Sequence, residues 1–197
     1  LSGQDNRIER IKQRWGFATI SGTNAAMLYS AVYATNQGAT GIVVNAINAV
    51  ISNTTVGSAR GSAIGKLGGG TLRLGHNILV ANGSESNSVI VWEQGGLRSD
   101  WNNLLARDQA WIGNRDGKWE KLAYWQAASG LDSNSVSFEP LFQNESAGDF
   151  HLNSTAGRWS LAFNDWDYGD TTNSPLIDLG DPWIGTGHLN DFCVVTP

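Results

Sequence analysis

Residues 72–80 read Leu-Arg-Leu-Gly-His-Asn-Ile-Leu-Val, and the stretches 48–56 and 97–105 align with them around a shared asparagine. The shared asparagines are spaced 24 and 25 residues apart, at Asn53, Asn77 and Asn102. Between them lies a second apolar run in each period, at 41–44, 62–64 and 88–91. Each period is therefore predicted to hold two short strands. A period of about 24 residues is too short for two packed helices and is typical of one coil of an all-β solenoid.

Stacked coils place equivalent residues over one another at the strand spacing of about 4.8 Å. We therefore expect a structural ladder at one corner of the coil, in which each amide bonds to the next and satisfies the polar groups of a sharp turn. The ladder residues are Asn53, Asn77 and Asn102, and Asn53 is expected to point inside. The same alignment predicts stacking on successive coils of Val50, Leu74 and Ser99.

The ends of a solenoid leave strand edges and apolar core uncovered, so caps are expected. We divide the chain into β-helix coils over residues 1–107, with an N-terminal cap segment 1–16, and irregular Trp- and Gly-rich C-terminal coils and cap over 108–197.

Two short helices are expected in these caps. Ile8, Ile11 and Trp15 recur at helical spacing, which favours a capping helix, with an irregular first coil as the alternative. Residues 119–129 are closed by Gly130 and are typical of a short helix with a glycine at its C-terminus.

From Thr71 onward a series of short motifs follows in a fixed order. They are Leu-Arg-Leu-Gly-His-Asn-Ile-Leu (72–79), Ser-Asp-Trp-Asn-Asn-Leu-Leu-Ala (99–106), Ala-Tyr-Trp-Gln-Ala-Ala-Ser-Gly (123–130), Glu-Pro-Leu-Phe (139–142), Gly-Asp-Phe-His-Leu (148–152), and Ser-Pro-Leu-Ile-Asp (174–178) with Gly-Asp-Pro (180–182). On these motifs the chain resembles the repeat regions of very large secreted or surface proteins of bacteria, of planctomycete type. The resemblance implies a right-handed parallel β-helix in a surface or secreted module, and it implies no single activity.

Charge is unevenly distributed over the chain, whose formal net charge is −5. Residues 1–84 contain two acids and seven bases, whereas residues 85–197 contain 16 acids and six bases. The basic cluster near the start is short and the whole chain is acidic, which disfavours nucleic acid as a partner. No apolar run approaches the roughly 18 residues of a membrane span, so no span is expected.

Cysteine usage bears on the location of the protein. The chain has one Cys, Cys193, one Met and nine Trp, which favours an exported protein that avoids oxidisable side chains, with an inert buried thiol as the alternative. It begins at Leu1 without a leader-like segment, which suggests a mature product or a piece of something longer. We therefore expect an extracellular or cell-surface protein.

Parallel β-helices also carry polysaccharide lyases and glycoside hydrolases, which need acids on adjacent coils. No carboxylate lies between Glu9 and Glu85, so most regular coils lack the acids for such a mechanism or for a calcium site. Asp100 beside Arg98 is explained by a solvated ion pair. No catalytic residue is assigned. We expect a non-catalytic structural or adhesive extracellular module; the alternative is a polysaccharide lyase or another carbohydrate-active or glycan-binding β-helix protein.

Tryptophans crowd the second half of the chain. Large rings fill irregular caps, and they also stack on sugar faces, so both roles stay open. The candidates for glycan contact are Trp92, Trp101, Trp111 and Trp119.

A calcium loop is considered at Asp165, Asp167 and Asp170, whose carboxylates crowd around a turn with a glycine. An acidic solvent-exposed turn is the alternative, and no other cofactor is expected.

Self-association is the last expectation. The basic residues Arg7, Arg10, Lys12 and Arg14 and the acidic second half would give a stacked chain opposite charges at its two ends. Head-to-tail contact between such ends would build a filament or array of neighbouring subunits. The alternative is that the basic segment is merely the solvated face of a cap. A polysaccharide is a further candidate partner.

Overall fold

The computed structural model describes residues 6–14, 16–160 and 162–181. The chain divides into two compact units, unit 1 over residues 1–137 and unit 2 over residues 138–197.

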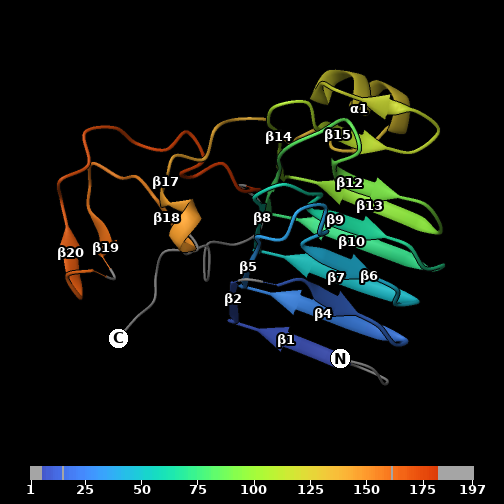
Figure 1. Cartoon of the computed structure of the whole chain (residues 1–197), viewed down its shortest axis with the longest axis horizontal. Helices are drawn as coiled ribbons and strands as arrows, with labels where there is room; N and C mark the ends of the chain where they lie inside the picture. The colour runs from blue at the N-terminus through green and yellow to red at the C-terminus, as the bar shows by residue number, and fades with distance from the viewer. Residues whose placement is uncertain (1–5, 15, 161, 182–197) are drawn as a thin grey trace. The chain divides into compact units, whose positions relative to one another are not determined.

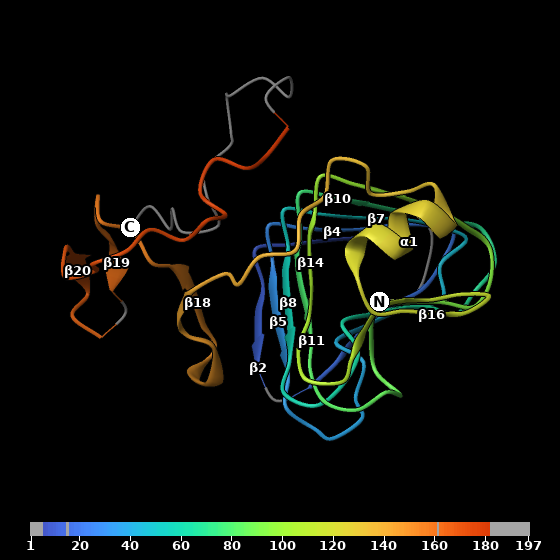
Figure 2. The same ribbon diagram turned by 90° about the horizontal axis from the view of Figure 1, so that it is seen from above.

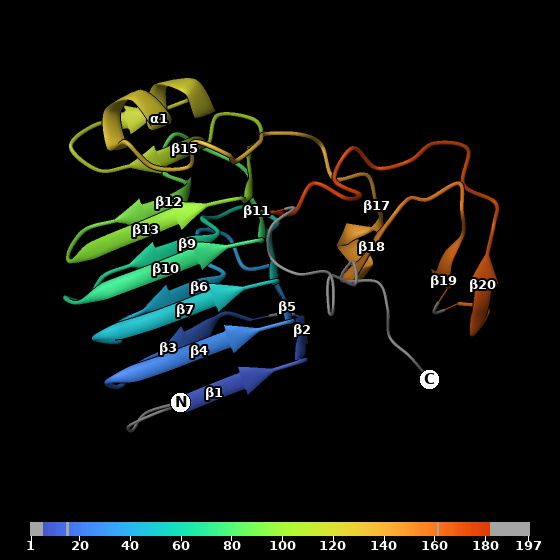
Figure 3. The ribbon, with the colours of Figure 1, turned by 180° about the vertical axis from the view of Figure 1, so that it is seen from behind.

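Unit 1 is a parallel β-helix built from three sheets (Figures 1 and 3). Sheet A contains, in order, β1 (Asn6–Glu9), β4 (Asn24–Leu28), β7 (Asn48–Ser52), β10 (Thr71–Gly75) and β13 (Gly96–Asp100). Sheet B contains β2 (Lys12–Arg14), β5 (Ala31–Ala34), β8 (Thr55–Ser58), β11 (Ile78–Ala81) and β14 (Asn103–Ala106). Sheet C contains β3 (Ala18–Ile20), β6 (Ile42–Val44), β9 (Ile64–Lys66), β12 (Ser88–Trp92), β15 (Trp111–Asn114) and the antiparallel β16 (Lys118–Trp119). The all-β fold expected from the period is confirmed.

Each coil contributes one strand to each of the three sheets, so the expectation of two strands per period was wrong. The apolar stretch 72–80 contains two strands, β10 and β11, and not one. His76 and Asn77 separate them, and His76 has a left-handed φ of 58°. The chain turns a corner there because a residue in this conformation cannot continue a strand.

Strand pairing sets the register of the coils. Leu74 pairs with Ser99 as expected, but its partner in the preceding coil is Ile51 and not Val50. Val50 points outward, level with Arg73. The offset arises because the step from Ile51 to Leu74 is 23 residues, whereas the alignment used 24.

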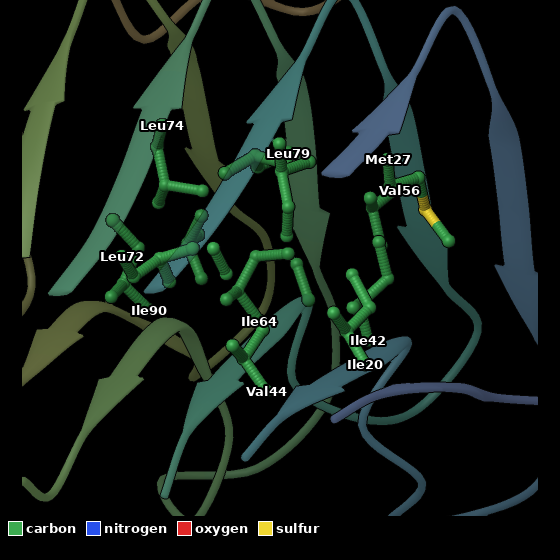
Figure 4. Packing of buried hydrophobic residues seen from close by; sticks show 14 of the residues in the cluster. Ile20, Met27, Ile42, Val44, Val56, Ile64, Leu72, Leu74, Leu79 and Ile90 are labelled. Atoms are coloured by element: carbon green, nitrogen blue, oxygen red, sulfur yellow. The ribbon is translucent and has the colours of Figure 1, made fainter. Parts of the chain in front are cut away.

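The core fills the interior of the coils, where buried aliphatic side chains from all three sheets meet (Figure 4). Leu72 and Leu74 in sheet A alternate with outward residues, as a strand with one buried face requires. Leu79 from sheet B and Ile90 from sheet C are fully buried in the same cluster. Burial of each such side chain contributes about 1.5–3 kcal/mol to folding.

The first coil consists of strands, and the expected capping helix is absent from the described part of residues 6–14. Ile8 lies in β1 and is level with Met27 of β4. Ile8, in β1, and Ile11, which directly precedes β2, are partly buried and pack against the core. Their helical spacing arises because a corner at Arg10, with φ 53°, lies between them. Trp15 lies outside the described residues.

The opposite end of unit 1 is covered by α1 (Leu122–Ser129), which lies across the end of the coils when the molecule is seen from above (Figure 2). Gly130 ends the helix with φ 69°, and its N–H donates to the carbonyl of Gln126 at 2.9 Å. The expected end of the helix at Gly130 is thus confirmed, but the helix begins at Leu122 and not at Trp119, because Trp119 pairs with Gly113 in β16. Trp125 is 1% exposed and lies directly over Gly113, where a Cβ would be 2.2 Å from the indole. This cap belongs to unit 1, so the boundary expected after residue 107 falls inside that unit.

Unit 2 contains two antiparallel strand pairs. The first joins β17 (Phe142–Asn144) to β18 (Asp149–Leu152) through the 3-10 helix η1 (Glu145–Ala147). The second joins β19 (Arg158–Ser160) to β20 (Asp165–Asp167). Edge-to-face aromatic pairs stabilise both, between Phe142 and Phe150 and between Trp159 and Trp166.

Candidate functional site

A row of buried hydrogen bonds runs along the corner between sheets A and B. Asn102 Oδ1 accepts from the N–H of Asn77 at 3.0 Å and from its Nδ2 at 3.1 Å. Asn77 Oδ1 accepts from the N–H of Thr54 at 3.0 Å, and its Nδ2 donates to the carbonyl of Ile51 at 2.9 Å. Ser30 continues the row toward the first coil, where its hydroxyl accepts a backbone N–H at 3.3 Å. These side chains satisfy backbone groups that the corner leaves without strand partners.

Asn53 does not belong to this row, because Thr54 is the residue level with Asn77. Asn53 has a left-handed φ of 50°, as do the residues at the equivalent position of the neighbouring coils. We name this set the corner row: Arg10, Tyr29, Asn53, His76 and Trp101. Asn53 is half-buried and Nδ2 donates to the hydroxyl of Ser52 at 3.1 Å. Asparagine suits the row of buried hydrogen bonds through its amide, and it suits the corner row because it tolerates the left-handed conformation. The repeat alone therefore assigned Asn53 to the wrong row.

Asp132 connects the row of buried hydrogen bonds at Asn77 and Asn102 to the cap helix α1. It is 1% exposed, and Oδ1 accepts from Ser99 Oγ and Ser135 Oγ, each at 2.7 Å, and from Asn102 Nδ2 at 3.3 Å. Its Oδ2 accepts from Trp125 Nε1 at 2.8 Å. One carboxylate therefore joins the corner hydrogen bonds to the indole that closes the core. Sequence reasoning missed this residue.

A cavity of about 310 Å³ lies beside the cap. It is lined by Trp92, Arg115, Asp116, Trp119, Trp125, Ala128 and Ser129. The Arg115 guanidinium carbon lies 3.5 Å from the centre of the Trp92 ring, a cation–π contact. Arg115 Nε is 3.4 Å from Asp116 Oδ2, and the Arg115 carbonyl accepts from Trp119 Nε1 at 3.3 Å. Indole rings, a guanidinium and a carboxylate thus line one space. The Ser129 hydroxyl at its edge donates to the Trp125 carbonyl at 2.7 Å and accepts from the Leu131 N–H at 3.1 Å.

The structure brings together two of the four glycan-contact candidates, Trp92 and Trp119. Trp111 starts β15 beside Ser88, at the other end of β12 from Trp92, and Nε1 donates to the carbonyl of Glu85 at 2.8 Å. Trp101 lies in the corner row. Arg115, which sequence reasoning did not select, occupies the turn between β15 and β16. A signal for it was present in the hairpin-like sequence Asn-Arg-Asp-Gly at 114–117.

Lys66 is a further residue that the sequence did not mark, because lysine is rarely buried. It is level with Trp92 in sheet C and is fully buried. Its Nζ donates to the carbonyl of Gly69 at 2.7 Å and to that of Gly68. Burial lowers the pKa of Lys66 below its ordinary value of 10.5. Through its two hydrogen bonds, the Lys66 ammonium stabilises the glycine-rich corner that joins sheet C to sheet A.

Two of the three carboxylates considered for calcium, Asp167 and Asp170, bind a buried arginine in unit 2. Arg158, 4% exposed, donates through Nη2 to Asp167 Oδ2 at 2.9 Å and through Nε to Asp170 Oδ2 at 2.8 Å. Asp170 Oδ2 also accepts from the N–H of Ser154 at 2.9 Å, and Asp165 Oδ1 accepts from the next N–H in the chain at 2.8 Å. Within the described residues, no group of three or more His, Cys, Asp or Glu side chains is arranged to hold a metal ion. The loop is therefore organised by Arg158 in this structure.

Asp100 is bound by the segment that follows the cap helix, and no ion pair joins it to Arg98 in the described structure. Asp100 Oδ1 accepts from the N–H of Asn134 at 2.7 Å, and Oδ2 accepts from Asn134 Nδ2 at 2.8 Å.

The two units differ in charge. Residues 138–197, which make up unit 2, contain nine acids and one base. The capping part of unit 1, residues 108–137, contains four acids and three bases. The negative charge of the second half thus belongs to unit 2, and the closed end of the coils is nearly neutral. Head-to-tail self-association of the chain stays a prediction.

No family model matches the chain, and neither a curated protein nor a solved structure matches it. Among the described residues, no helix has the length and apolar character needed to cross a membrane.

Proposed function

We propose that the chain is an adhesive module of an extracellular or cell-surface assembly, related to bacterial surface β-helix proteins, and that it holds a glycan in the cavity beside the cap. The observation that carries the proposal is the convergence of Trp92, Trp119, Arg115, Asp116 and Ser129 on one space of about 310 Å³. Sugars present C–H faces that stack on indoles and hydroxyls that bond to charged and polar groups.

The scaffold supports this function because the cavity residues stand on packed elements. Trp92 is anchored by Nε1, which donates to the carbonyl of Gly95 at 2.9 Å. Trp119 packs against the core from β16, and Ser129 ends a helix whose Trp125 is buried. Side chains held in place before binding lose little conformational entropy when a ligand arrives. The Arg115 guanidinium already covers the Trp92 face, so a bound sugar would either stack on Trp119 or displace Arg115 toward its own hydroxyl or carboxylate oxygens.

Titration calorimetry against a panel of neutral and acidic glycans tests the proposal. Trp119→Ala is expected to weaken binding about tenfold, the loss typical of a stacking aromatic anchor. The matched control is Tyr124→Ala, which removes a ring that is 51% exposed on α1 and does not line the cavity. Absence of binding to every glycan, or an equal loss in both variants, would contradict the proposal.

The same incubations test the lyase alternative. Unsaturated sugar ends that accumulate with time would assign the protein to catalysis. A stable complex without such ends supports adhesion.

A further inference from the structure

The outer face of sheet A carries a line of in-register side chains, one from each coil. We name it the arginine row: Arg7, Ala26, Val50, Arg73 and Arg98. Arg73 and Arg98 are exposed and directly level on adjacent strands, about 4.8 Å apart along the axis of the solenoid. Like charges placed directly opposite one another on a sheet destabilise it.

Neighbouring carboxylates do not neutralise this pair. Within the described residues, no ion pair joins Arg73 or Arg98 to an acid, and the acids of this face are engaged elsewhere. Asp100 is held by Asn134 at 2.7 and 2.8 Å, and Glu9 is paired with Arg7 on the same strand. The two guanidinium groups are therefore available to an anion from outside the chain.

The surroundings of the arginine row are polar, small and aromatic. On one side lie Asn24 and Asn48, joined by a hydrogen bond of 3.1 Å from Asn48 Nδ2 to Asn24 Oδ1. On the other side Gly75, which has no side chain, separates Arg73 from the corner row. The corner row adds a ring that is 37% exposed at Tyr29. The two arginines thus lie on the adjacent strands β10 and β13, and the two asparagines lie on the adjacent strands β4 and β7 of the same face.

We propose that this face binds an extended acidic polysaccharide that lies along the solenoid axis, with carboxylates of its uronate residues on Arg73 and Arg98. Arg73 and Arg98 lie on adjacent coils, and the step between coils is close to the length of one sugar unit, so successive charged sugars can present a carboxylate to each guanidinium. Sugar hydroxyls match the amides of Asn24 and Asn48, and apolar ring faces match Val50. Duplex nucleic acid fits less well, because its affinity depends on many phosphate contacts and the described residues of sheet A supply two unpaired cations.

This surface is separate from the cavity, whose residues lie on sheet C, the turn after β15 and α1. Binding at sheet A therefore does not depend on whether the cavity binds a glycan. The two are distinguished by Trp119→Ala, which is expected to leave binding at sheet A unchanged.

The test compares polygalacturonate with its methyl-esterified form, which has the same backbone without the negative charges. We expect the protein to bind polygalacturonate, and R73Q/R98Q to weaken that binding about tenfold through the loss of charge-assisted hydrogen bonds. Esterification of the polymer should have a similar effect, and binding should weaken as salt is raised. The matched control is Arg60→Gln, which removes an exposed cation outside sheet A.

The melting temperature of R73Q/R98Q should equal or exceed that of the unsubstituted chain, because a like-charge pair is removed. Three results would overturn the inference: equal binding by R73Q/R98Q and Arg60→Gln, equal binding of the esterified and charged polymers, or tighter binding of duplex DNA than of polygalacturonate. If the double variant does not fold, the comparison of the two polymers on the unsubstituted chain still decides the question.

Discussion

Replacement of Asp132 by Ala should strongly destabilise unit 1. The Asp132 carboxylate accepts four hydrogen bonds in a buried site, and the donors are Ser99, Ser135, Asn102 and Trp125. The substitution removes the one carboxylate that joins the corner of the coils to the indole over the core.

The magnitude follows from what each donor retains. Trp125 Nε1 is left buried without its acceptor, which costs about 1–3 kcal/mol. The hydroxyls of Ser99 and Ser135 can turn to other acceptors and lose about 1 kcal/mol together, while Asn102 Nδ2 keeps its bond to the Asp100 carbonyl at 3.0 Å. Alanine at the φ of 58° adds about 1–2 kcal/mol of strain. Release of a desolvated charge offsets part of this sum, so we expect a loss of about 3 kcal/mol.

The assay is urea unfolding followed by tryptophan fluorescence, with thermal unfolding as a second measure. A loss of 3 kcal/mol corresponds to a fall of roughly 12 °C in Tm for a unit of this size. Asp116→Ala is the matched control, because Asp116 has a left-handed φ of 52° and its side chain is 91% exposed. Asp132→Asn keeps one acceptor oxygen and should lose about 1–2 kcal/mol. Equal stability of the two alanine variants would refute the reasoning, since backbone strain alone would then explain both.

Four further substitutions test the corners of the coils. Asn77→Ala should lower the free energy of unfolding by about 2 kcal/mol, because it leaves a buried N–H and a buried carbonyl of the preceding coil unpaired. Asn53→Gly should change the free energy of unfolding by less than about 0.5 kcal/mol. Equal effects of the two substitutions in urea unfolding would contradict the register. Gly70→Ala should cost about 3 kcal/mol or more, because φ is 80° and the added Cβ would lie 1.5 Å from a carbonyl oxygen of the preceding coil; a Tm within a few degrees of the unsubstituted chain would be inconsistent with this corner. Burial lowers the pKa of Lys66 in the folded chain. At pH values between that lowered pKa and 10.5, the unfolded chain therefore binds more protons than the folded chain, and the contribution of Lys66 makes the free energy of unfolding rise with pH. The Tm of the unsubstituted chain relative to that of Lys66→Met should therefore increase as pH approaches 10.5, and a constant difference would show that Lys66 does not titrate as described.

The sequence was sufficient to predict the coils, because a solenoid requires the same residue types at the same place in every turn. Leu72, Leu74 and Asn77 recur with the period, and this repetition identifies buried strands and a polar corner without any knowledge of contacts. The helix that ends at Gly130 was also predictable, since a glycine with positive φ is a local signal. The first coil was not predictable in this way. Ile8 and Ile11 have helical spacing, and only pairing with β4 and β5 shows that a corner separates them.

The register and the functional surfaces were decided by tertiary structure. The steps between paired residues vary, with 23 from Ile51 to Leu74 and 25 from Leu74 to Ser99, so a fixed period cannot tell Asn53 from Thr54. The level pairing of Arg73 with Arg98 depends on that register. Asp132 reaches back to a strand that is 33 residues earlier in the chain, and the cavity is assembled from β12, the β15–β16 turn and α1. Such contacts depend on the lengths of the corners and on the position of the cap helix, and the spacing of a single motif encodes neither. Composition and period therefore determine that the chain forms coils, whereas packing determines which side chains meet.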